Sequence, residues 1–526
     1  PATPIIRKQV KNYSKFFRAK DRRDTVKKLN SNISTAAQMH LAVMSALCGN
    51  NDIQPNHIVR SVIHAGLDLD TNSIYQSFVN YGADKPFWAM VAQATGYSEG
   101  DDVSLGRLAI HMLLTAATRT MHLDHLAGLD AFISTPHQAW CYDFVSDWLH
   151  SADNRQLYDV ARYVEEEARL PQRFSQLAVE DLVDPEVFPC INECLLTSLM
   201  KEISDHIIQV DTIKATVEKR RTMVWYDSVS SYYEGLLQVA NMQAFFLEHS
   251  AGFHTVEPHK IWKEYTTDYY RMDTYYRQFH LCFQKALKIS NSLLDDLFKH
   301  VTEKVEGLYS HWFLGQLGQN WSDAAAEDLE KYGRILEVTQ QEDFYQRKVA
   351  KKDNRVFVII SDAFRYEVAA ELAGQLQRET QAKVNLKSMQ AVFPTITKFG
   401  MAALLPHKAL SVELKTGKTD RLAVLADGQS TEANNRDKLL KAADKASVAL
   451  KYKDIIGMKR ADRQALIKGM NVVYIYHDTI DEAGHLESSI FSACDTAIEE
   501  IKNMVRIIAN EWGGANILIT ADHGFL

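Results

Sequence analysis

The spacing of hydrophobic positions changes about two thirds of the way along the chain. From residue 7 to about residue 341, apolar residues recur every three or four positions, and runs typical of strands are scarce. After residue 344 unbroken apolar runs appear: "VFVIIS" at 356–361, "NVVYIYH" at 471–477 and "NILIT" at 516–520. The pattern predicts a helical region over residues 1–345, in two helical subdomains, followed by an α/β domain over residues 346–526.

The three apolar runs predict buried parallel strands. They are rich in β-branched residues and do not alternate with polar ones, and helical patterns at 366–379 and 488–510 lie between them. This arrangement is typical of a parallel sheet covered on both faces. We therefore expect the three strands to be neighbours in one sheet. Their carboxyl ends should meet at one edge, where sheets of this kind bind ligands.

Two patterns in the helical region could indicate a binding site or a metal site, but an ordinary structural role explains each of them better. Seven residues step alternately by three and four and share one helical face: Trp262, Tyr265, Tyr269, Met272, Tyr276, Phe279 and Phe283. Such a stripe could stack nucleotide bases, but a packed core is its commoner use. The motif "HLDHL" places His122 and His125 near each other on a helix, with Asp124 to one side. Because Asp124 does not share their face, we do not expect a metal site there.

Composition indicates an ordinary globular protein of two to four domains. The chain has 526 residues, of which 46% are hydrophobic and 24% charged. The net charge of -8 does not by itself suggest nucleic-acid binding. Residues 1–30 hold ten Lys and Arg against two Asp, which favours a solvated helix face over a nucleic-acid groove. The six cysteines are too scattered for a disulfide framework, and we expect Cys190 and Cys194 to be small core residues.

The expected location is the cytoplasm. The sequence has no run of 18 apolar residues and no basic-then-apolar leader at its start, so we expect a soluble protein without a membrane partner. The first residues, "PATPII", lack a Met, and we expect the chain to begin inside a larger protein.

Acidic and imidazole side chains follow all three predicted strands. They are Asp362 after the first strand, His477, Asp478, Asp481 and His485 after the second, and Asp522 and His523 after the third. One Asp after a strand can be a helix cap. Three such occurrences, two with His, favour a metal site, because crowded carboxylates repel one another unless a cation holds them. Mixed Asp and His donors suit zinc or manganese.

A nucleophile is expected in the loop "AVFPTITKFGMAALLPH". It offers Thr395 and Thr397, whose hydroxyls become good nucleophiles once a metal lowers their pKa. Either threonine could instead cap the helix that "FGMAALL" predicts. The sequence contains no Walker-type phosphate loop, so we do not expect an ATPase.

In combination, these motifs resemble the alkaline phosphatase superfamily. Within it, "VFVIISDAFRYE", "FPTITKFGMAALLPH", "YKDIIGM", "VVYIYHDTIDEAGH" and "ITADHGFL" resemble the type A PglZ family of BREX phage-defence systems. The resemblance covers roughly residues 355–526. It implies an alkaline-phosphatase-like α/β domain with a mainly parallel sheet, incomplete at its C-terminal end, after a long all-helical region.

The resemblance implies two adjacent divalent metal ions, with zinc expected first and manganese or magnesium as alternatives. One ion would use Asp362, Thr397, Asp522 and His523. The other would use Asp481, His485 and a further His beyond residue 526. Thr397 would attack phosphorus and form a phospho-threonine intermediate. Arg365 would contact phosphate oxygens, although a place on a helix surface is an equal alternative.

The resemblance also implies a function. We expect a metal-dependent phosphohydrolase of antiviral defence, in first place a phosphodiesterase or nuclease acting on DNA or RNA. Expected partners are other BREX components, namely a small BrxB-like protein and the methyltransferase PglX. The alternative is a catalytically weak scaffold whose helical region binds other BREX components.

Overall fold

The structure is a computed structural model that describes residues 4–29, 33–100, 102–289, 291–351, 354–416, 421–484 and 489–524. The chain forms two compact units. One contains Pro1–Leu237 and Ala286–Val301, and the other contains Gln238–Lys285 and Thr302–Leu526. The boundary that the sequence suggested at residue 345 stays a prediction. Within the described ranges, no helix is long and apolar enough to cross a membrane.

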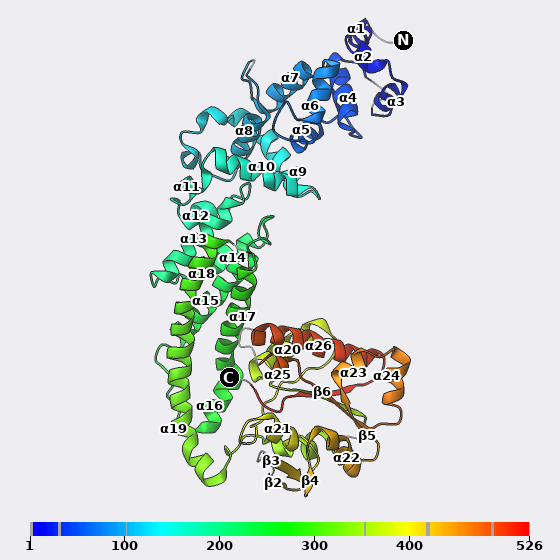
Figure 1. Cartoon of the computed structure of the whole chain (residues 1–526). Helices are drawn as coiled ribbons and strands as arrows, with labels where there is room; N and C mark the ends of the chain where they lie inside the picture. The colour runs from blue at the N-terminus through cyan, green and yellow to red at the C-terminus, as the bar shows by residue number, and fades with distance from the viewer. Residues whose placement is uncertain are drawn as a thin grey trace. The chain divides into compact units, whose positions relative to one another are not determined.

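The first unit is helical, as the three-to-four spacing predicted, and Figure 1 shows it in blue to green. Both Cys190 and Cys194 are buried on one of its helices, as expected of core residues. Its helices are α1 (Pro4–Asn12), α2 (Ser14–Phe17), α3 (Lys20–Leu29), α4 (Ala36–Cys48), α5 (Pro55–His64), α6 (Ser73–Tyr81), α7 (Asp84–Thr95), α8 (Leu105–Ala117), η1 (Leu123–Leu126), η2 (Asp130–Phe132), η3 (Thr135–His137), α9 (Gln138–Leu149), α10 (Asn154–Glu167), α11 (Leu170–Phe174), α12 (Val179–Leu182), α13 (Cys190–Ser204), α14 (Val210–Arg220), and parts of α15 (Ser230–Glu248) and α18 (Ser292–Glu306).

The second unit begins with helices that continue the predicted helical region. They are α16 (Pro258–Glu264), η4 (Tyr265–Tyr269), α17 (Tyr270–Leu287), η5 (Gly307–Leu314) and α19 (Gly315–Tyr332). The segment η4 is a π-helical turn, which rotates the helical face relative to regular α-helical spacing. The aromatic stripe is therefore divided. Met272 and Phe279 are fully buried in the core, whereas Trp262 and Tyr265 border a cavity described below.

A four-stranded parallel sheet forms the centre of the α/β part of this unit. Its strands are β1 (Val356–Ser361), β5 (Ser447–Lys451), β6 (Val472–His477) and β7 (Asn516–Thr520), in the order β5-β6-β1-β7. Val356 pairs in register with Val472 and with Asn516. The three predicted strands are thus parallel neighbours, as expected, and β5 was not predicted.

Helices cover both faces of this sheet (Figure 1). Phe357 and Ile359 of β1 pack in a core with α20 (Tyr366–Glu379) and α26 (Ile490–Asn510). The alternate residues Val356, Val358 and Ile360 pack in a second core with α21 (Thr397–Ala403) and α22 (Ala433–Ala443). Burial on both faces explains why β1 shows no alternation of polar and apolar residues.

The remaining elements lie around the central sheet. An antiparallel sheet, which the sequence did not predict, has the order β2-β3-β4. The remaining helices and strands, including those of the antiparallel sheet, are η6 (Gln341–Asp343), η7 (Tyr345–Val349), β2 (Leu410–Lys415), β3 (Arg421–Ala426), β4 (Gln429–Ser430), α23 (Tyr452–Ile456), α24 (Arg460–Leu466) and α25 (Thr479–Ala483).

Candidate metal centre

The carboxyl ends of two adjacent strands bring acidic and imidazole groups together. Asp362 directly follows β1, and Asp522 and His523 follow β7 after one residue. The strands are parallel and in register from Val356 to Ile360, so their ends lie at the same edge. Helix α21 packs against that edge and places Thr397, its first residue, beside them.

Strand alternation decides which side chains point toward α21. Ser361 faces the opposite side, where its hydroxyl is 2.9 Å from Nδ1 of His477. Asp362, the next residue, turns to the side of α21. Ala363 then adopts the left-handed conformation with φ of 60°, and its N–H donates to Oδ1 of Asp522 at 3.2 Å. The strained backbone at Ala363 therefore joins the two strand ends.

Four side chains form a close cluster, called here the acidic cluster: Asp362, Thr397, Asp522 and His523. The Thr397 hydroxyl lies 3.0 Å from Nε2 of His523 and 3.4 Å from Oδ1 of Asp362. Nε2 of His523 lies 3.5 Å from Oδ1 of Asp362 and 3.5 Å from Oδ2 of Asp522. The donor atoms of both Asp and His523 all lie within 4.8 Å of one another.

The electrostatics of the acidic cluster are unfavourable without a cation. Burial, the charge of Asp522 and the charge of Asp481 raise the pKa of Asp362 far above its usual range. Burial also raises the pKa of Asp522, against the opposing effect of His523. Each shift means that the environment disfavours the carboxylate form.

The residues of the acidic cluster fit a divalent metal ion. Oδ2 of Asp522 is buried and has no hydrogen-bond partner among the described residues. An unsatisfied buried carboxylate oxygen is costly unless a cation or a donor faces it. The neighbouring Asp362 oxygen and His523 nitrogen supply the mixed O and N donors that zinc and manganese accept.

Gly400 allows α21 to approach the end of β7. A Cβ atom at this position would lie 2.3 Å from the backbone oxygen and 2.7 Å from the backbone carbon of Asp522. That oxygen is also held by the side-chain amide of Gln341, which donates to it at 2.6 Å. The absence of a side chain at Gly400 therefore sets the distance between Thr397 and Asp522.

The described residues predicted after β6 are not among the side chains that form the acidic cluster. Asp481 is exposed on α25, and its charge acts on Asp362 more weakly than that of Asp522. His485 lies outside the described residues. His477 is buried, and its Nε2 lies 2.8 Å from a carboxylate oxygen of Glu500. Asp478 pairs with Lys453 at 3.2 Å. The second metal site that the sequence suggested thus stays a prediction.

Arg365 lies in a buried charge cluster beside the site. Its guanidinium pairs with Asp273 of α17 at 3.1 Å and with Glu367 of α20 at 3.4 Å. Burial works against its charge, but the carboxylates of Asp273 and Glu367 outweigh burial and raise the pKa of Arg365. Its side chain is 16% exposed, so it does not lie on an open helix surface. A contact with phosphate oxygens stays a prediction.

A second buried arginine, Arg277 of α17, was not singled out from the sequence. Its Nε donates to Glu367 at 2.9 Å and its Nη1 to Asp495 at 3.1 Å, and it also pairs with Glu371. Both Arg277 and Glu367 are fully buried. Asp273 and Arg277 directly follow the stripe residues Met272 and Tyr276 but are not part of the stripe, so its spacing gave no signal for these contacts.

The other candidates from the sequence are not part of the acidic cluster. Thr395 is exposed, whereas Thr397 is partly buried. His122, Asp124 and His125 surround a short 3₁₀ turn, and they are not among the groups of described residues that could hold a metal.

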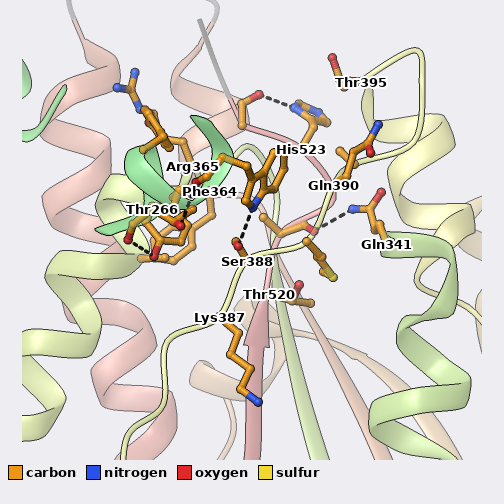
Figure 2. A pocket seen from close by; sticks show the side chains of 18 of the residues that line it. Thr266, Gln341, Phe364, Arg365, Lys387, Ser388, Gln390, Thr395, Thr520 and His523 are labelled. Atoms are coloured by element: carbon orange, nitrogen blue, oxygen red, sulfur yellow. Dashed lines mark hydrogen bonds between the residues drawn. The ribbon is translucent and has the colours of Figure 1, made fainter. Parts of the chain in front are cut away.

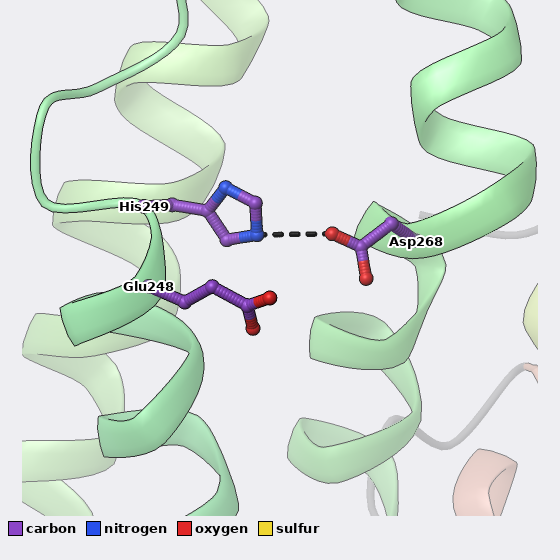
Figure 3. Close-up of side chains that lie close together, drawn as sticks. All are labelled: Glu248, His249 and Asp268. Carbon is purple, nitrogen blue, oxygen red and sulfur yellow. Dashed lines mark hydrogen bonds and ion pairs between the residues drawn. The ribbon is translucent and has the colours of Figure 1, made fainter.

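One further group of metal-ligating side chains lies elsewhere in the second unit (Figure 3). Nε2 of His249 lies 3.0 Å from Asp268, with Glu248 nearby. Arg271 pairs with Asp268 and lies 3.5 Å from Glu248. Because Arg271 already neutralises these carboxylates, the group is better explained as an ion-pair cluster than as a metal site.

A cavity of about 630 Å³ opens beside the acidic cluster, and Figure 2 shows its lining. Asp522, His523 and Thr395 line it where it meets the cluster. Large aromatic side chains line much of the rest, among them Trp262, Tyr265, Trp321, Phe364 and Phe393. We call this cavity the aromatic chamber.

Comparisons with known proteins find a matching family model and two similar curated proteins. Residues 344–526 match the family model described as the BREX system PglZ alkaline phosphatase-like domain. The alkaline phosphatase-like protein PglZ of Bacillus cereus (strain H3081.97) is 30% identical over 529 residues, which cover 99% of this chain and 60% of that protein. The alkaline phosphatase-like protein BrxZ of Escherichia coli O9:H4 (strain HS) is 28% identical over 545 residues, which cover 99% of this chain and 62% of that protein. The chain thus spans about three fifths of the length of these curated relatives.

Proposed function

We propose that this protein is a metal-dependent phosphohydrolase, because residues 344–526 match the BREX system PglZ alkaline phosphatase-like domain, the family that the sequence motifs resemble. The observation that supports this proposal most is the acidic cluster, in which Thr397 lies beside the buried, unsatisfied Asp522 and the donors Asp362 and His523. The expected substrates are phosphodiesters of DNA or RNA.

Asp362, Asp522 and His523, together with Thr397, would hold one divalent cation. When bound, the cation would supply positive charge that lowers the pKa of the Thr397 hydroxyl and offsets the negative charge of a phosphate. Zinc is the first expectation, with manganese and magnesium as alternatives. Asp481 and His485 remain the proposed residues of a second site.

Thr397 is the proposed nucleophile. Its hydroxyl lies 3.4 Å from a carboxylate oxygen of Asp362, which would accept its hydrogen and orient the oxygen. Nε2 of His523, 3.0 Å from that hydroxyl, would face the cation instead. In the first step the Thr397 proton moves to Asp362, a bond forms between the Thr397 oxygen and phosphorus, and the bond from phosphorus to the leaving-group oxygen breaks. In the second step a bond forms between a water oxygen and phosphorus, the bond from phosphorus to the Thr397 oxygen breaks, and Thr397 regains a proton. Arg365 is a proposed contact for phosphate oxygens.

The setting that we propose is BREX phage defence in the cytoplasm. Other BREX components are the proposed partners, including a small BrxB-like protein and the methyltransferase PglX. The alternative, a catalytically weak scaffold for these components, predicts that the protein binds them without hydrolysing phosphoesters.

Hydrolysis of bis(p-nitrophenyl) phosphate and of p-nitrophenyl phosphate, with zinc or manganese added to metal-stripped protein, tests the proposal. We expect metal-dependent release of nitrophenolate that Thr397→Ala reduces at least 1,000-fold, on the scale of losing a catalytic nucleophile. Thr395→Ala separates the two candidate threonines of the loop. Thr496→Ala, an exposed threonine on α26, serves as the control.

Full activity of Thr397→Ala would refute the assignment of the nucleophile. Failure of the wild type to hydrolyse either ester with zinc or with manganese would leave the scaffold as the better proposal.

A further inference from the structure

The aromatic chamber is much larger than a phosphate group requires. Its volume of about 630 Å³ lies within the range of sites that enclose a small organic ligand. One end is formed by Asp522 and His523 of the acidic cluster, so a ligand that fills the chamber would place its phosphate at Thr397. The organic group attached to the phosphate would therefore bind in the chamber.

The aromatic walls of the chamber are held in place by their polar atoms. The indole N–H of Trp262 donates to the hydroxyl of Ser388 at 2.8 Å, a contact drawn in Figure 2. The hydroxyl of Tyr265 donates to Asp273 at 2.5 Å. Trp321 of α19 lies against Trp262, with ring centroids 6.1 Å apart. With their polar atoms hydrogen-bonded, Trp262 and Tyr265 can offer flat apolar surfaces without reorganising.

We propose that the aromatic chamber binds the base of an unpaired nucleotide whose phosphate lies at Thr397. This inference rests on the proposed function. Base stacking on aromatic side chains suits flat heteroaromatic rings of any sequence. The helical elements α16 and α19, which carry Trp262 and Trp321, then select the substrate for the α/β part.

Polar groups on the loop after α20 favour a nucleotide over a lipid chain. Asn385 and Lys387 line the chamber and are exposed, and the Ser388 hydroxyl retains its own hydrogen for donation. Figure 2 shows Lys387 toward the end of the view opposite His523. The ammonium group of Lys387 is suited at this position to contact the next phosphate of a nucleic-acid strand. A base within a duplex cannot reach the chamber while it is stacked, so single strands are the expected substrate.

Two esters with the same leaving group isolate the contribution of the base. Thymidine 5′-(p-nitrophenyl phosphate) and methyl p-nitrophenyl phosphate both release nitrophenolate, and they differ in the nucleoside that replaces the methyl group. We expect kcat/KM of the wild type to be at least tenfold higher for the thymidine ester. Trp262→Ala and Trp321→Ala should each lower this preference about 5- to 150-fold, the range for loss of one stacked base.

Matched variants separate stacking from folding. Trp321→Phe keeps a ring and should restore part of the preference. Trp140→Ala, a partly buried tryptophan of α9 in the other unit, should leave the rates for both esters unchanged.

The measurements distinguish failure of the chamber proposal from failure of the proposed function. An equal rate for both esters in the wild type, or an equal loss for both esters in the tryptophan variants, would overturn the chamber proposal while leaving hydrolysis intact. If the wild type hydrolyses neither ester, the proposed function fails, and calorimetric titration with thymidine 5′-monophosphate and methyl phosphate decides about the chamber alone. Thymidine monophosphate binding that Trp321→Ala abolishes would support it, and no binding would overturn it.

Discussion

Replacing Gly400 by alanine tests whether the approach of α21 to β7 sets the activity. Gly400 is buried inside α21, where helix propensity alone predicts that alanine stabilises by about 0.5–1 kcal/mol. The structure predicts the opposite. The new Cβ would meet the Asp522 backbone oxygen at 2.3 Å, and backbone atoms cannot rotate away.

The size of the effect follows from the distance that must open. Ordinary van der Waals contact begins at 3.4 Å, so the start of α21 must move about 1 Å from the end of β7. The same movement would separate Thr397, which lies on α21, from His523, whose side-chain atoms are now 3.0 Å apart. A displacement of 1 Å in a catalytic group lowers the rate roughly 100-fold, which corresponds to about 2.7 kcal/mol of transition-state stabilisation.

The assay is kcat/KM on bis(p-nitrophenyl) phosphate with saturating zinc or manganese. Gly457→Ala is the control, because a Cβ there would meet its nearest neighbours, the backbone oxygens of Asp454 and Lys453, at 3.8 Å. We expect a loss of roughly 100-fold for Gly400→Ala and less than twofold for Gly457→Ala. If Gly400→Ala retains activity within about threefold of the wild type, the close approach does not position the nucleophile.

Three further predictions concern metal, stability and pH. Asp522→Ala should remove most of the rise in melting temperature that zinc or manganese gives the wild type, since metal stabilises the folded state by mass action, and an equal rise in both proteins would refute the metal assignment. Arg277→Ala should destabilise the second unit by about 3–5 kcal/mol in urea unfolding, because it removes the nearer of the two arginines that pair with buried Glu367, and a loss below 1 kcal/mol would contradict this reasoning. Burial lowers the pKa of His477, so the unfolded chain binds a proton more readily at this residue, and the contribution of His477 to the stability of metal-free protein should fall as pH drops below about 6.5, whereas the raised pKa of Asp362 acts in the opposite direction. His477→Gln should weaken that fall in melting temperatures measured between pH 5 and 8, and an unchanged pH profile would contradict the burial argument.

The central sheet was predictable because its strands are buried on both faces. Val356, Phe357 and Val358 are all apolar although they point in alternating directions, and a strand needs such a run only where both of its faces are covered. The antiparallel sheet was not predictable in the same way. Strand β2 is largely exposed and carries Glu413 and Lys415, so its sequence lacks a hydrophobic signal. Strand β5 is short and only partly buried, which made it equally ambiguous.

The approach of Asp362 and Asp522 could be inferred from the sequence because parallel strands share their carboxyl edge. Their roles as metal ligands stay predictions. The contacts of Arg277 could not be inferred with the same reasoning, because its partner Glu367 lies 90 positions away on a separate helix. The π-helical turn at η4 likewise has no sequence signature in the three-to-four spacing, and it turns Trp262 and Tyr265 from expected core residues into walls of the chamber.

The aromatic walls of the chamber also have a consequence for dissecting the protein. The matched family domain begins at residue 344, yet Trp262 and Trp321 precede it and belong to the same compact unit. A fragment cut at that boundary would keep the acidic cluster and lose both indole rings, along with the Asp273 carboxylate that faces Arg365. Under the proposed function, truncation at residue 344 would remove the side chains that choose the substrate and keep those proposed for the chemistry.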